Sequence, residues 1–315
     1  MPQSNSGVRV VDPVLSSVAQ GYQILDFVGG KLFPRVPVKV RGGQIIEFGR
    51  DAFRLYASKR APGGRTARIQ FGYAGKPFAL LQDAIEVPLP REHMQDAAIT
   101  PGIDLGRRAV NVGMRNMGLS LEVDQAALAT NAANYAATNK VTLAGATKWS
   151  VSTGVPLTDV DTAREAIRQQ CGVYPNVMLL SALAFNACKN NPNVVQRFQY
   201  NGQAGTDASQ ITPQMLAGLF NVKEVVVGAG VYWNDANTAV DIWGNAAVLA
   251  YVPQTSADLS LEEPSYGYTY TLEGNPLVEP PYWDAPSKSW VYGVTFERAP
   301  VLSGIAAGYL ISNPA

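Results

Sequence analysis

The stretch that decides the fold is IDLGRRAVNVGMRNMGLSLEVDQAALATNAANY, residues 103–135. Its apolar residues recur at steps of three, four or seven, which is the spacing of one face of an α-helix. A continuous helix from Ile103 to Asn131 would be about 43 Å long at 1.5 Å per residue. Because this exceeds the usual length of a globular helix, we expect it to span a domain. The residues of the predicted face are Ile103, Val110, Met114, Met117, Leu121, Leu128 and Tyr135.

Three glycines interrupt this pattern, at positions 106, 113 and 118. Each glycine costs a helix about 1 kcal/mol relative to alanine. Two interpretations stay open: another part of the chain packs closely against the helix there, or the helix bends there. An ordinary core helix would explain the segment by itself equally well.

Composition indicates a chain that covers part of its surface with a partner. The 315 residues are 47% hydrophobic and 16% charged, against about 25% charged in ordinary soluble domains. No apolar run reaches the roughly 18 residues of a membrane-spanning helix, and the N-terminus lacks the layout of a signal peptide. Cys171 and Cys188 both fall in segments predicted to be helical, so we expect no disulfide framework and a reducing compartment.

Charge is distributed unevenly although the formal net charge is zero. Between Lys31 and Arg68 there are ten basic residues and two acids, whereas residues 224–287 contain nine acids and no base. Such asymmetry predicts either nucleic acid on the basic side or a contact between one part of a chain and another.

The N-terminal third is predicted to be an arm followed by a long hairpin. Residues 1–30 are typical of an arm, with a short helix predicted over 13–22. Strand-like sequence then runs over 33–56 and again over 67–90, and the turn signal Pro62-Gly63-Gly64 lies between the two runs. Two strands alone are at best marginally stable, so we expect this basic-tipped hairpin to lie on another surface.

Helices and strands alternate from residue 158 to residue 252, which is typical of a compact α/β unit. Strands in the last sixty residues are expected to return to the long helix. The predicted boundary residues are Thr158 as an N-cap with Asp159 and Asp161 in the first turn, Gly172 as a left-handed C-terminal residue, and Ser181 and Thr212-Pro213 as further N-terminal caps.

The sequence offers no catalytic, cofactor or metal site. The single histidine, His93, cannot form a metal cluster, and we interpret it as a surface or interface residue. No G-x-S-x-G nucleophile motif occurs, and GYAGK at 72–76 lacks the spacing of a phosphate-binding loop. The cluster of Asp159, Asp161 and Glu165 could supply paired catalytic carboxylates, but capping and pairing along the helix explain these residues more economically.

The order of these parts resembles the major capsid protein of tailed phages, which has the HK97-like fold of class α+β. Four stretches carry the resemblance, with residues 33–55 and 60–64 at the hairpin entry: 148–167, 175–200, 240–253 and 290–313. The resemblance implies five parts: an N-terminal arm (1–42), an E-loop hairpin (43–90), a P-domain with the long "spine" helix (91–154), an A-domain (155–255) and returning strands that complete the P-domain (256–315).

The resemblance implies a structural protein rather than an enzyme. Copies would form the hexamers and pentamers of an icosahedral phage head that encloses double-stranded DNA without sequence specificity. We expect a portal, a separate scaffolding protein because only about 40 residues precede the hairpin, and optionally a decoration or minor capsid protein as partners. The expected location is the virion, assembled in the host cytoplasm without a membrane. The alternatives are an encapsulin-like nanocompartment shell and, more weakly, an α/β enzyme.

For the charge asymmetry we expect the basic hairpin to lie over acidic parts of a neighbouring subunit. DNA contact by the hairpin is the competing hypothesis, and the zero net charge of the chain favours the contact between subunits. The predicted contact residues are Arg50, Arg54, Lys59, Arg60, Arg65 and Arg68 on the basic side, and Asp258, Glu262, Glu263 and Glu273 on the acidic side.

Overall fold

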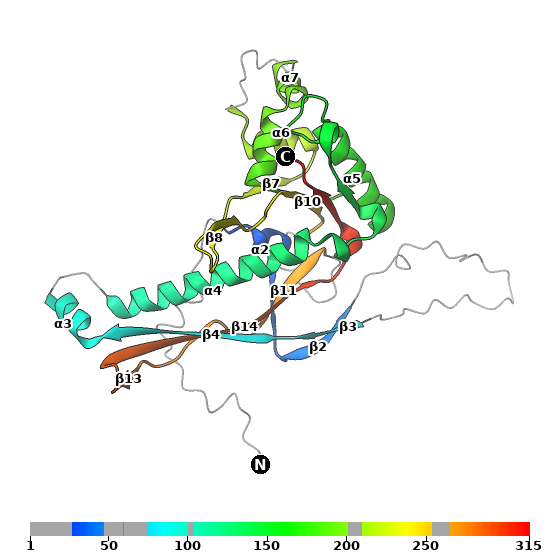
Figure 1. The fold of residues 1–315 in the computed structure, drawn as a ribbon. Coiled ribbons are helices and arrows are strands. Elements are labelled where there is room, and N and C mark those ends of the chain that lie inside the picture. The colour runs from blue at the N-terminus through cyan, green and yellow to red at the C-terminus, as the bar shows by residue number, and fades with distance from the viewer. Residues whose placement is uncertain (1–26, 47–58, 60–74, 100–103, 201–209, 254–264) are drawn as a thin grey trace.

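A computed structural model of the chain describes residues 27–46, 59, 75–99, 104–200, 210–253 and 265–315. An elongated arm built along one long helix carries a compact lobe at one end (Figure 1). The helices longer than one turn of 3₁₀ are α2 (Gly29–Leu32), α3 (Arg91–Ile99), α4 (Leu105–Thr130), α5 (Pro156–Cys171), α6 (Ala182–Asn190), α7 (Pro192–Tyr200) and α8 (Pro213–Phe220). Among these described helices, none is both long and apolar enough to cross a membrane.

Two larger sheets and two ribbons hold the strands. The arm sheet contains β1 (Arg35–Val38), β4 (Leu81–Pro90), β11 (Gly267–Leu272), β12 (Leu277–Val278), β13 (Tyr282–Asp284) and β14 (Ser289–Leu302). The lobe sheet has the order β5 (Lys140–Thr142), β15 (Gly308–Ser312), β10 (Ala246–Ala250), β6 (Val177–Ser181) and β7 (Glu224–Gly228). The ribbons pair β2 (Gly42–Ile46) with β3 (Gly75–Ala79), and β8 (Val231–Trp233) with β9 (Ala239–Asp241).

The long helix predicted from the sequence is confirmed as α4, whose 26 residues extend about 39 Å. It begins where the Asp104 carboxylate accepts the backbone N–H of Arg107 at 3.0 Å, which satisfies a donor that the first turn leaves free. It ends at Thr130, because Asn131 leaves the helical conformation and accepts the N–H of Ala133 at 2.9 Å. Tyr135 therefore lies beyond the helix, and its hydroxyl returns to the Ala129 carbonyl at 2.7 Å.

The apolar face of α4 packs on the arm sheet. Tyr292, Val294 and Phe296 of β14 lie in one buried cluster with this face of the helix. The predicted return of the C-terminal strands to the long helix is thus confirmed. Of the predicted face, Val110, Met114, Met117 and Leu121 are buried and Leu128 is half-buried, whereas Ile103 lies outside the described residues.

Two of the three helix glycines stand where β14 comes close. A Cβ on Gly106 would lie 2.8 Å from the Tyr292 hydroxyl oxygen, and a Cβ on Gly113 would lie 3.2 Å from a Val294 methyl carbon. Both distances are shorter than ordinary contact between carbon and a neighbouring heavy atom. At these two positions the geometry favours close packing as the reason for glycine.

The strand β14 joins the parts of the arm sheet, because β4, β11, β12 and β13 all pair with it. Its pairing with β4 is antiparallel over ten positions, from Ser289 opposite Pro90 to Arg298 opposite Leu81. Alternate residues of β4 (Ile85, Val87 and Leu89) pack against the cluster under α4. The other face of β4 is exposed.

The predicted hairpin range 43–90 divides into two different pairings. β2 and β3 form an antiparallel ribbon from Gly42 opposite Ala79, but from Leu81 onward the chain leaves this ribbon and pairs with β14. Phe78 fastens the base of the ribbon to the arm sheet, with its ring 4.8 Å from that of Tyr270. The predicted basic tip, apart from Lys59, and the short helix predicted over 13–22 lie outside the described residues.

The lobe contains the α/β unit predicted over residues 158–252, but its sheet also includes β5 and β15, which the prediction placed outside the unit. One face of its sheet packs against α5, α6, α7 and α8. The other face packs against α2 and the C-terminal end of α4, through Leu32, Ala126 and Ala129. The lobe therefore rests directly on the end of the long helix, as Figure 1 shows.

Most predicted helix boundaries in the lobe are confirmed. Ser181 accepts the N–H of Ala184 at 3.2 Å, and Thr212 accepts that of Met215 at 3.4 Å. Gly172 ends α5 with a φ of 71°, a left-handed conformation that glycine adopts without a steric penalty.

The predicted N-cap Thr158 is wrong. The helix α5 begins earlier, with Val155 at the cap and Pro156 at the first helical position. Proline suits that position because its fixed φ is helical and its missing N–H would have no partner there. The first turn consequently holds Asp159 but not Asp161.

Candidate assembly surfaces and the joint at the long helix

The described residues hold no group of three His, Cys, Asp or Glu side chains placed to bind a metal ion. His93 is exposed on α3. Cys171 and Cys188 are both free, and burial raises the pKa of the Cys188 thiol to about 12. Because the thiolate is the reactive form, this cysteine is chemically inert at neutral pH.

The three carboxylates considered as a catalytic group each have a local partner. Glu165 accepts from Arg168 and from the Tyr174 hydroxyl, both at 2.8 Å, and these two hydrogen bonds lower its pKa. Asp159 accepts the indole N–H of Trp149 at 2.8 Å, and burial raises the pKa of this carboxyl. Asp161 lies 3.5 Å from Arg164. Helix pairing and tertiary anchoring thus account for all three.

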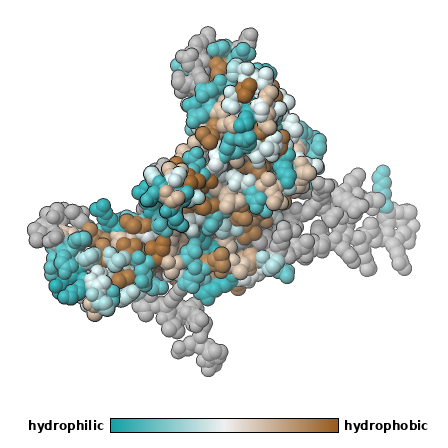
Figure 2. All heavy atoms as spheres, in the orientation of Figure 1, coloured by the Kyte–Doolittle hydropathy of each residue, from teal (hydrophilic) through white to brown (hydrophobic). Residues whose placement is uncertain are grey.

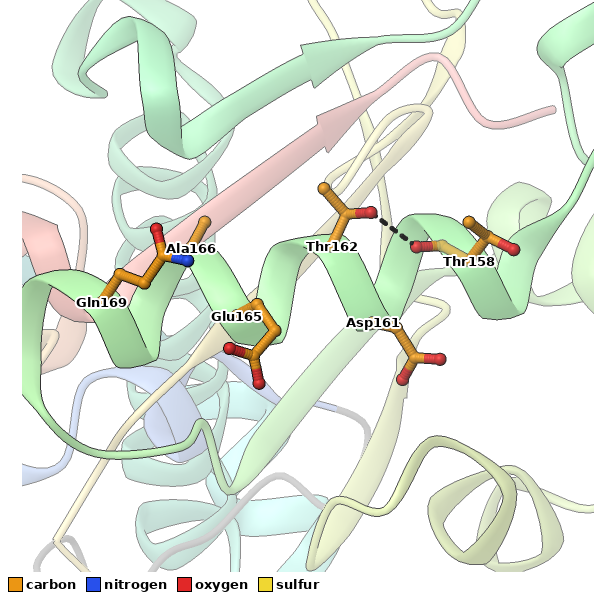
Figure 3. A pocket seen from close by; sticks show the side chains of 6 residues that line it. All are labelled: Thr158, Asp161, Thr162, Glu165, Ala166 and Gln169. Atoms are coloured by element: carbon orange, nitrogen blue, oxygen red, sulfur yellow. Dashed lines mark hydrogen bonds between the residues drawn. The ribbon is translucent and has the colours of Figure 1, made fainter.

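A groove of about 480 Å³ follows the outer face of α5. Figure 3 shows Asp161 and Glu165 pointing to the same side of the helix, while the Thr162 hydroxyl donates to the Thr158 carbonyl at 2.8 Å. Ala166 and Gln169 complete the lining. All six lining residues belong to one helix, so the groove is a surface feature without converging groups from other elements.

A buried carboxylate lies where α2 and the lobe meet the long helix α4. Glu122 of α4 is 2% exposed and accepts the backbone N–H groups of Val28 and Gly29, both at 3.0 Å. It also accepts the indole N–H of Trp243 at 2.7 Å. The first two donors begin α2 and the third belongs to the lobe, so one side chain joins three parts of the chain.

Burial raises the pKa of Glu122, and the three hydrogen bonds oppose this by lowering it. A buried carboxylate without such donors would be strongly unfavourable. A second polar link lies one turn further along α4, where Gln125 donates to the Thr269 hydroxyl at 2.8 Å. That hydroxyl in turn donates to the Phe33 carbonyl at 3.1 Å. Together these bonds fix the register between α2, α4 and β11.

We call this contact of α2 and Trp243 with Glu122 and Gln125 of α4 the joint. A cavity of about 390 Å³ lies beside it. Met114, Leu121 and Phe296 form its apolar wall. Of its two cationic residues, Lys31 pairs with Glu224 at 2.7 Å and the Arg35 guanidinium lies 5.6 Å from the Phe296 ring centre. Its charged groups therefore already serve the fold, and the cavity marks a joint between parts of the chain.

Part of the charge asymmetry is used inside the subunit. Lys31 and Glu224 belong to the basic and acidic segments, and they pair within one chain. Arg41, at the base of the ribbon, pairs with Glu297 of β14 at 2.6 Å. Of the predicted contacts between subunits, Lys59 and Glu273 are exposed. The others lie outside the described residues: Arg50, Arg54, Arg60, Arg65, Arg68, Asp258, Glu262 and Glu263.

Several aromatic residues that no sequence motif singled out are exposed. Trp233 is 72% exposed on the β8–β9 ribbon. Trp283 and Trp290, paired across β13 and β14, are 39% and 37% exposed with ring centres 5.6 Å apart. Figure 2 shows brown hydrophobic atoms among teal ones along the arm, over α4 and β4. Single exposed apolar residues are common, but apolar side chains that lie together on one surface are typical of a site that meets a partner.

Comparison with known proteins accounts for this architecture. A family model described as phage major capsid protein E matches residues 127–296, more than half of the chain. The major capsid protein of Burkholderia phage BcepMu is 34% identical over 311 residues, which cover 98% of each chain. The chain belongs to the phage major capsid protein family.

Solved structures agree with this assignment. The capsid protein is similar to a phage-related protein from Bordetella bronchiseptica RB50, at 45% identity, with 98% of each chain covered and a TM-score of 0.83. It also shares its fold with the capsid of cyanophage P-SCSP1u, at 10% identity and a TM-score of 0.58, with 99% of this chain and 95% of that chain covered. The predicted HK97-like α+β fold is confirmed.

Family and fold together establish a structural capsid shell protein that assembles with copies of itself and is a component of the virion. The shell is the functional feature of this chain, so its functional residues are those that meet other copies. Among the two shell alternatives, the named relative supports the phage capsid over the nanocompartment.

Proposed function

We propose that copies of this capsid protein form the hexamers and pentamers of an icosahedral phage head that encloses double-stranded DNA. The observation that carries the proposal is the combination of a long helix packed on one sheet with a separate β2–β3 ribbon, in a member of the capsid family. The five parts expected from the sequence, namely arm, E-loop, P-domain, A-domain and returning strands, are the proposed division of labour. A portal and a scaffolding protein are the proposed assembly partners.

The ribbon supports a contact with a neighbouring copy. Within the described residues, β2 and β3 pair only with each other, and a two-stranded ribbon alone is marginally stable in water. Its base is held by Phe78 and by the pair of Arg41 with Glu297. A neighbouring subunit would supply the surface that the rest of the ribbon needs.

Electron microscopy of particles made with the phage assembly genes tests the proposed head. Icosahedral particles filled with DNA would support it. Particles that enclose other proteins instead of DNA would contradict it and support a nanocompartment shell.

The contact predicted for the basic hairpin has its own test in the double variant Arg60→Glu with Arg65→Glu, called the ribbon variant although both positions lie outside the described residues. We expect a folded, soluble subunit that no longer forms shells, because reversed charges repel the acidic surface of the neighbour. The matched control changes Arg197 and Lys223 to Glu, since both are exposed in the lobe. Normal shells from the ribbon variant would contradict this contact. Tight binding of duplex DNA that only the ribbon variant loses would instead favour the DNA hypothesis.

A further inference from the structure

The β8–β9 ribbon carries the most exposed large hydrophobic side chain among the described residues. Trp233 is 72% exposed and Val231 is 47% exposed. Because side chains two positions apart on a strand point to the same face, these two form one apolar surface. Their partners across the ribbon are Ala239 and Asp241. The ribbon therefore presents a small apolar knob that nothing in the described part of its own chain covers.

Hydrogen bonds in the turn of this ribbon order the backbone that carries the knob. The Asn234 side-chain oxygen accepts the N–H groups of Ala236 and Thr238, both at 3.0 Å. The Asn234 N–H donates to the Thr238 carbonyl at 3.1 Å, and Asn237 adopts a φ of 53°. A surface that is already ordered loses little conformational entropy on binding. Tryptophan in such a position is a frequent centre of binding energy.

The knob is acidic at its edges. Asp235 lies in the turn and Asp241 ends β9, and both are exposed. Residues 231–241 contain no basic residue. A partner surface that fits this ribbon must therefore offer an apolar patch flanked by cations.

The outer face of α4 has these properties over its N-terminal half. Arg107, Arg108 and Arg115 are exposed there, and the described residues include no acidic side chain paired with any of them. Val112, 54% exposed, lies between Arg108 and Arg115 at helical spacings of four and three. The acid at this end of the helix, Asp104, is engaged in capping it.

We propose that the β8–β9 ribbon of one copy docks on the outer face of the N-terminal half of α4 in a second copy. Trp233 would cover Val112 between two guanidinium groups, an arrangement that adds cation–π attraction to apolar burial. Asp235 and Asp241 would face the arginines. The two surfaces differ, so each copy can use its ribbon and its helix with two different neighbours. Such head-to-tail contacts close rings or propagate a lattice, as a shell requires.

The apolar residues decide between a second copy and DNA as the occupant of the helix face. Phosphate groups would satisfy the three arginines, but they would leave Val112 and Trp233 exposed to water. A protein surface with both an aromatic residue and carboxylates satisfies all of them. The inference rests on assembly with copies, which the family shows, and not on the proposed DNA content of the head.

A charge exchange tests this docking. One variant changes Arg108 and Arg115 to Glu, a second changes Asp235 and Asp241 to Lys, and a third combines all four changes. Light scattering of purified subunits at increasing concentration gives the critical concentration for assembly. We expect each of the first two variants to raise it about tenfold or more, and the combined variant to return it to within about threefold of the starting protein, because direct partners couple. All four side chains are exposed, and thermal unfolding checks that each variant is folded.

Controls separate this contact from others. Changing Arg197 and Lys223 to Glu should leave the critical concentration unchanged. Trp233→Ala should raise it about tenfold, whereas Trp233→Phe should keep most of the apolar contact and raise it less. The proposal would be overturned if the arginine variant and the aspartate variant assembled normally. It would also be overturned if the combined variant had a critical concentration no lower than those two variants. Normal shells from the arginine variant that package less DNA would also overturn it and assign the arginines to nucleic acid.

Discussion

The two halves of α4 share one helix but lie in different surroundings. The first half, from Leu105 to about Leu119, buries one face on β14 and exposes arginines on the other. The second half buries one face against α2, β11 and the lobe, and even Glu122 and Gln125 are buried there. The first half is held mainly by apolar contact, with one hydrogen bond from the Arg298 guanidinium to the Met117 carbonyl. The second half combines apolar contact with several side-chain hydrogen bonds, made by Glu122 and Gln125. The comparison teaches that one amphipathic pattern can serve as a support at one end of a helix and as a joint at the other.

The largest effect is expected in the first half of α4, where the helix packs on β14. Met117 is 1% exposed in the cluster between α4 and β14. Met117→Ala should lower the free energy of unfolding by about 3 kcal/mol, since it removes buried contacts and leaves a cavity. Urea unfolding of the subunit followed by circular dichroism measures the change. Val112→Ala, on the exposed face, should change it by less than about 0.5 kcal/mol. Equal losses from the two variants would show that the helix is not packed on one side only.

The joint should respond to the loss of a single hydrogen-bond acceptor. Glu122→Ala leaves the N–H groups of Val28, Gly29 and Trp243 without their partner, and we expect a loss of about 2–3 kcal/mol in the free energy of unfolding. Glu122→Gln keeps one acceptor oxygen and should lose less. The exposed Ser120, on the same helix, provides a control as Ser120→Ala. If Glu122→Ala is as stable as this control, the carboxylate does not hold the joint.

The two closely packed glycines sharpen the contrast further. Gly106→Ala should cost about 1 kcal/mol, because its Cβ would press on the Tyr292 hydroxyl. Gly113→Ala should leave the free energy of unfolding nearly unchanged, because the gain in helix propensity offsets a milder contact with Val294. Thermal unfolding of both variants measures the difference. Unchanged stability together with shells of altered diameter would revive bending as the use of these glycines.

The smallest expected effect is the contribution of Glu122 to the pH dependence of stability. Because burial raises the pKa of Glu122 above its ordinary value of 4.5, the folded state binds this proton more tightly than the unfolded state. Stability should therefore fall as the pH rises through the folded pKa, and recover as the pH falls toward about 4.5. Glu122→Gln should remove this contribution. The cavity beside Glu122 is also lined by two cationic residues, Lys31 and Arg35.

Subtraction isolates the effect of Glu122. The free energies of unfolding of the starting protein and of Glu122→Gln, measured between about pH 4.5 and 7.5, are subtracted from each other. In this difference curve the contributions of other titrating groups cancel. Among these are Asp124 and Asp159, whose pKa values burial also raises. A flat difference curve would mean that Glu122 has the same proton affinity in the folded and unfolded chain.

Sequence patterns were sufficient wherever the determining interaction is local. The stripe from Val110 to Leu128 predicted α4 because helix periodicity depends only on residues three and four apart. Ser181, Thr212 and Gly172 marked helix ends correctly, since caps and left-handed turns act within one turn of the backbone. The prediction of Thr158 as an N-cap was wrong for a local reason as well, because Pro156 takes the first helical position and the helix begins two residues earlier than Thr158.

The joint and the exposed surfaces required the tertiary structure. An acid in a helix is ordinarily exposed. Glu122 can be buried because backbone and indole N–H groups satisfy its carboxylate, and these donors lie 93 and 121 residues away along the chain, where no local pattern reveals them. The pairing of β4 with β14 and the exposure of Trp233 likewise depend on segments far apart in sequence. The sequence by itself determined the family, the elements and most of their ends, because backbone geometry and helix periodicity are local. Only the tertiary structure decided which polar groups became a joint and which apolar groups stayed in solvent, because burial is set by everything that surrounds a residue.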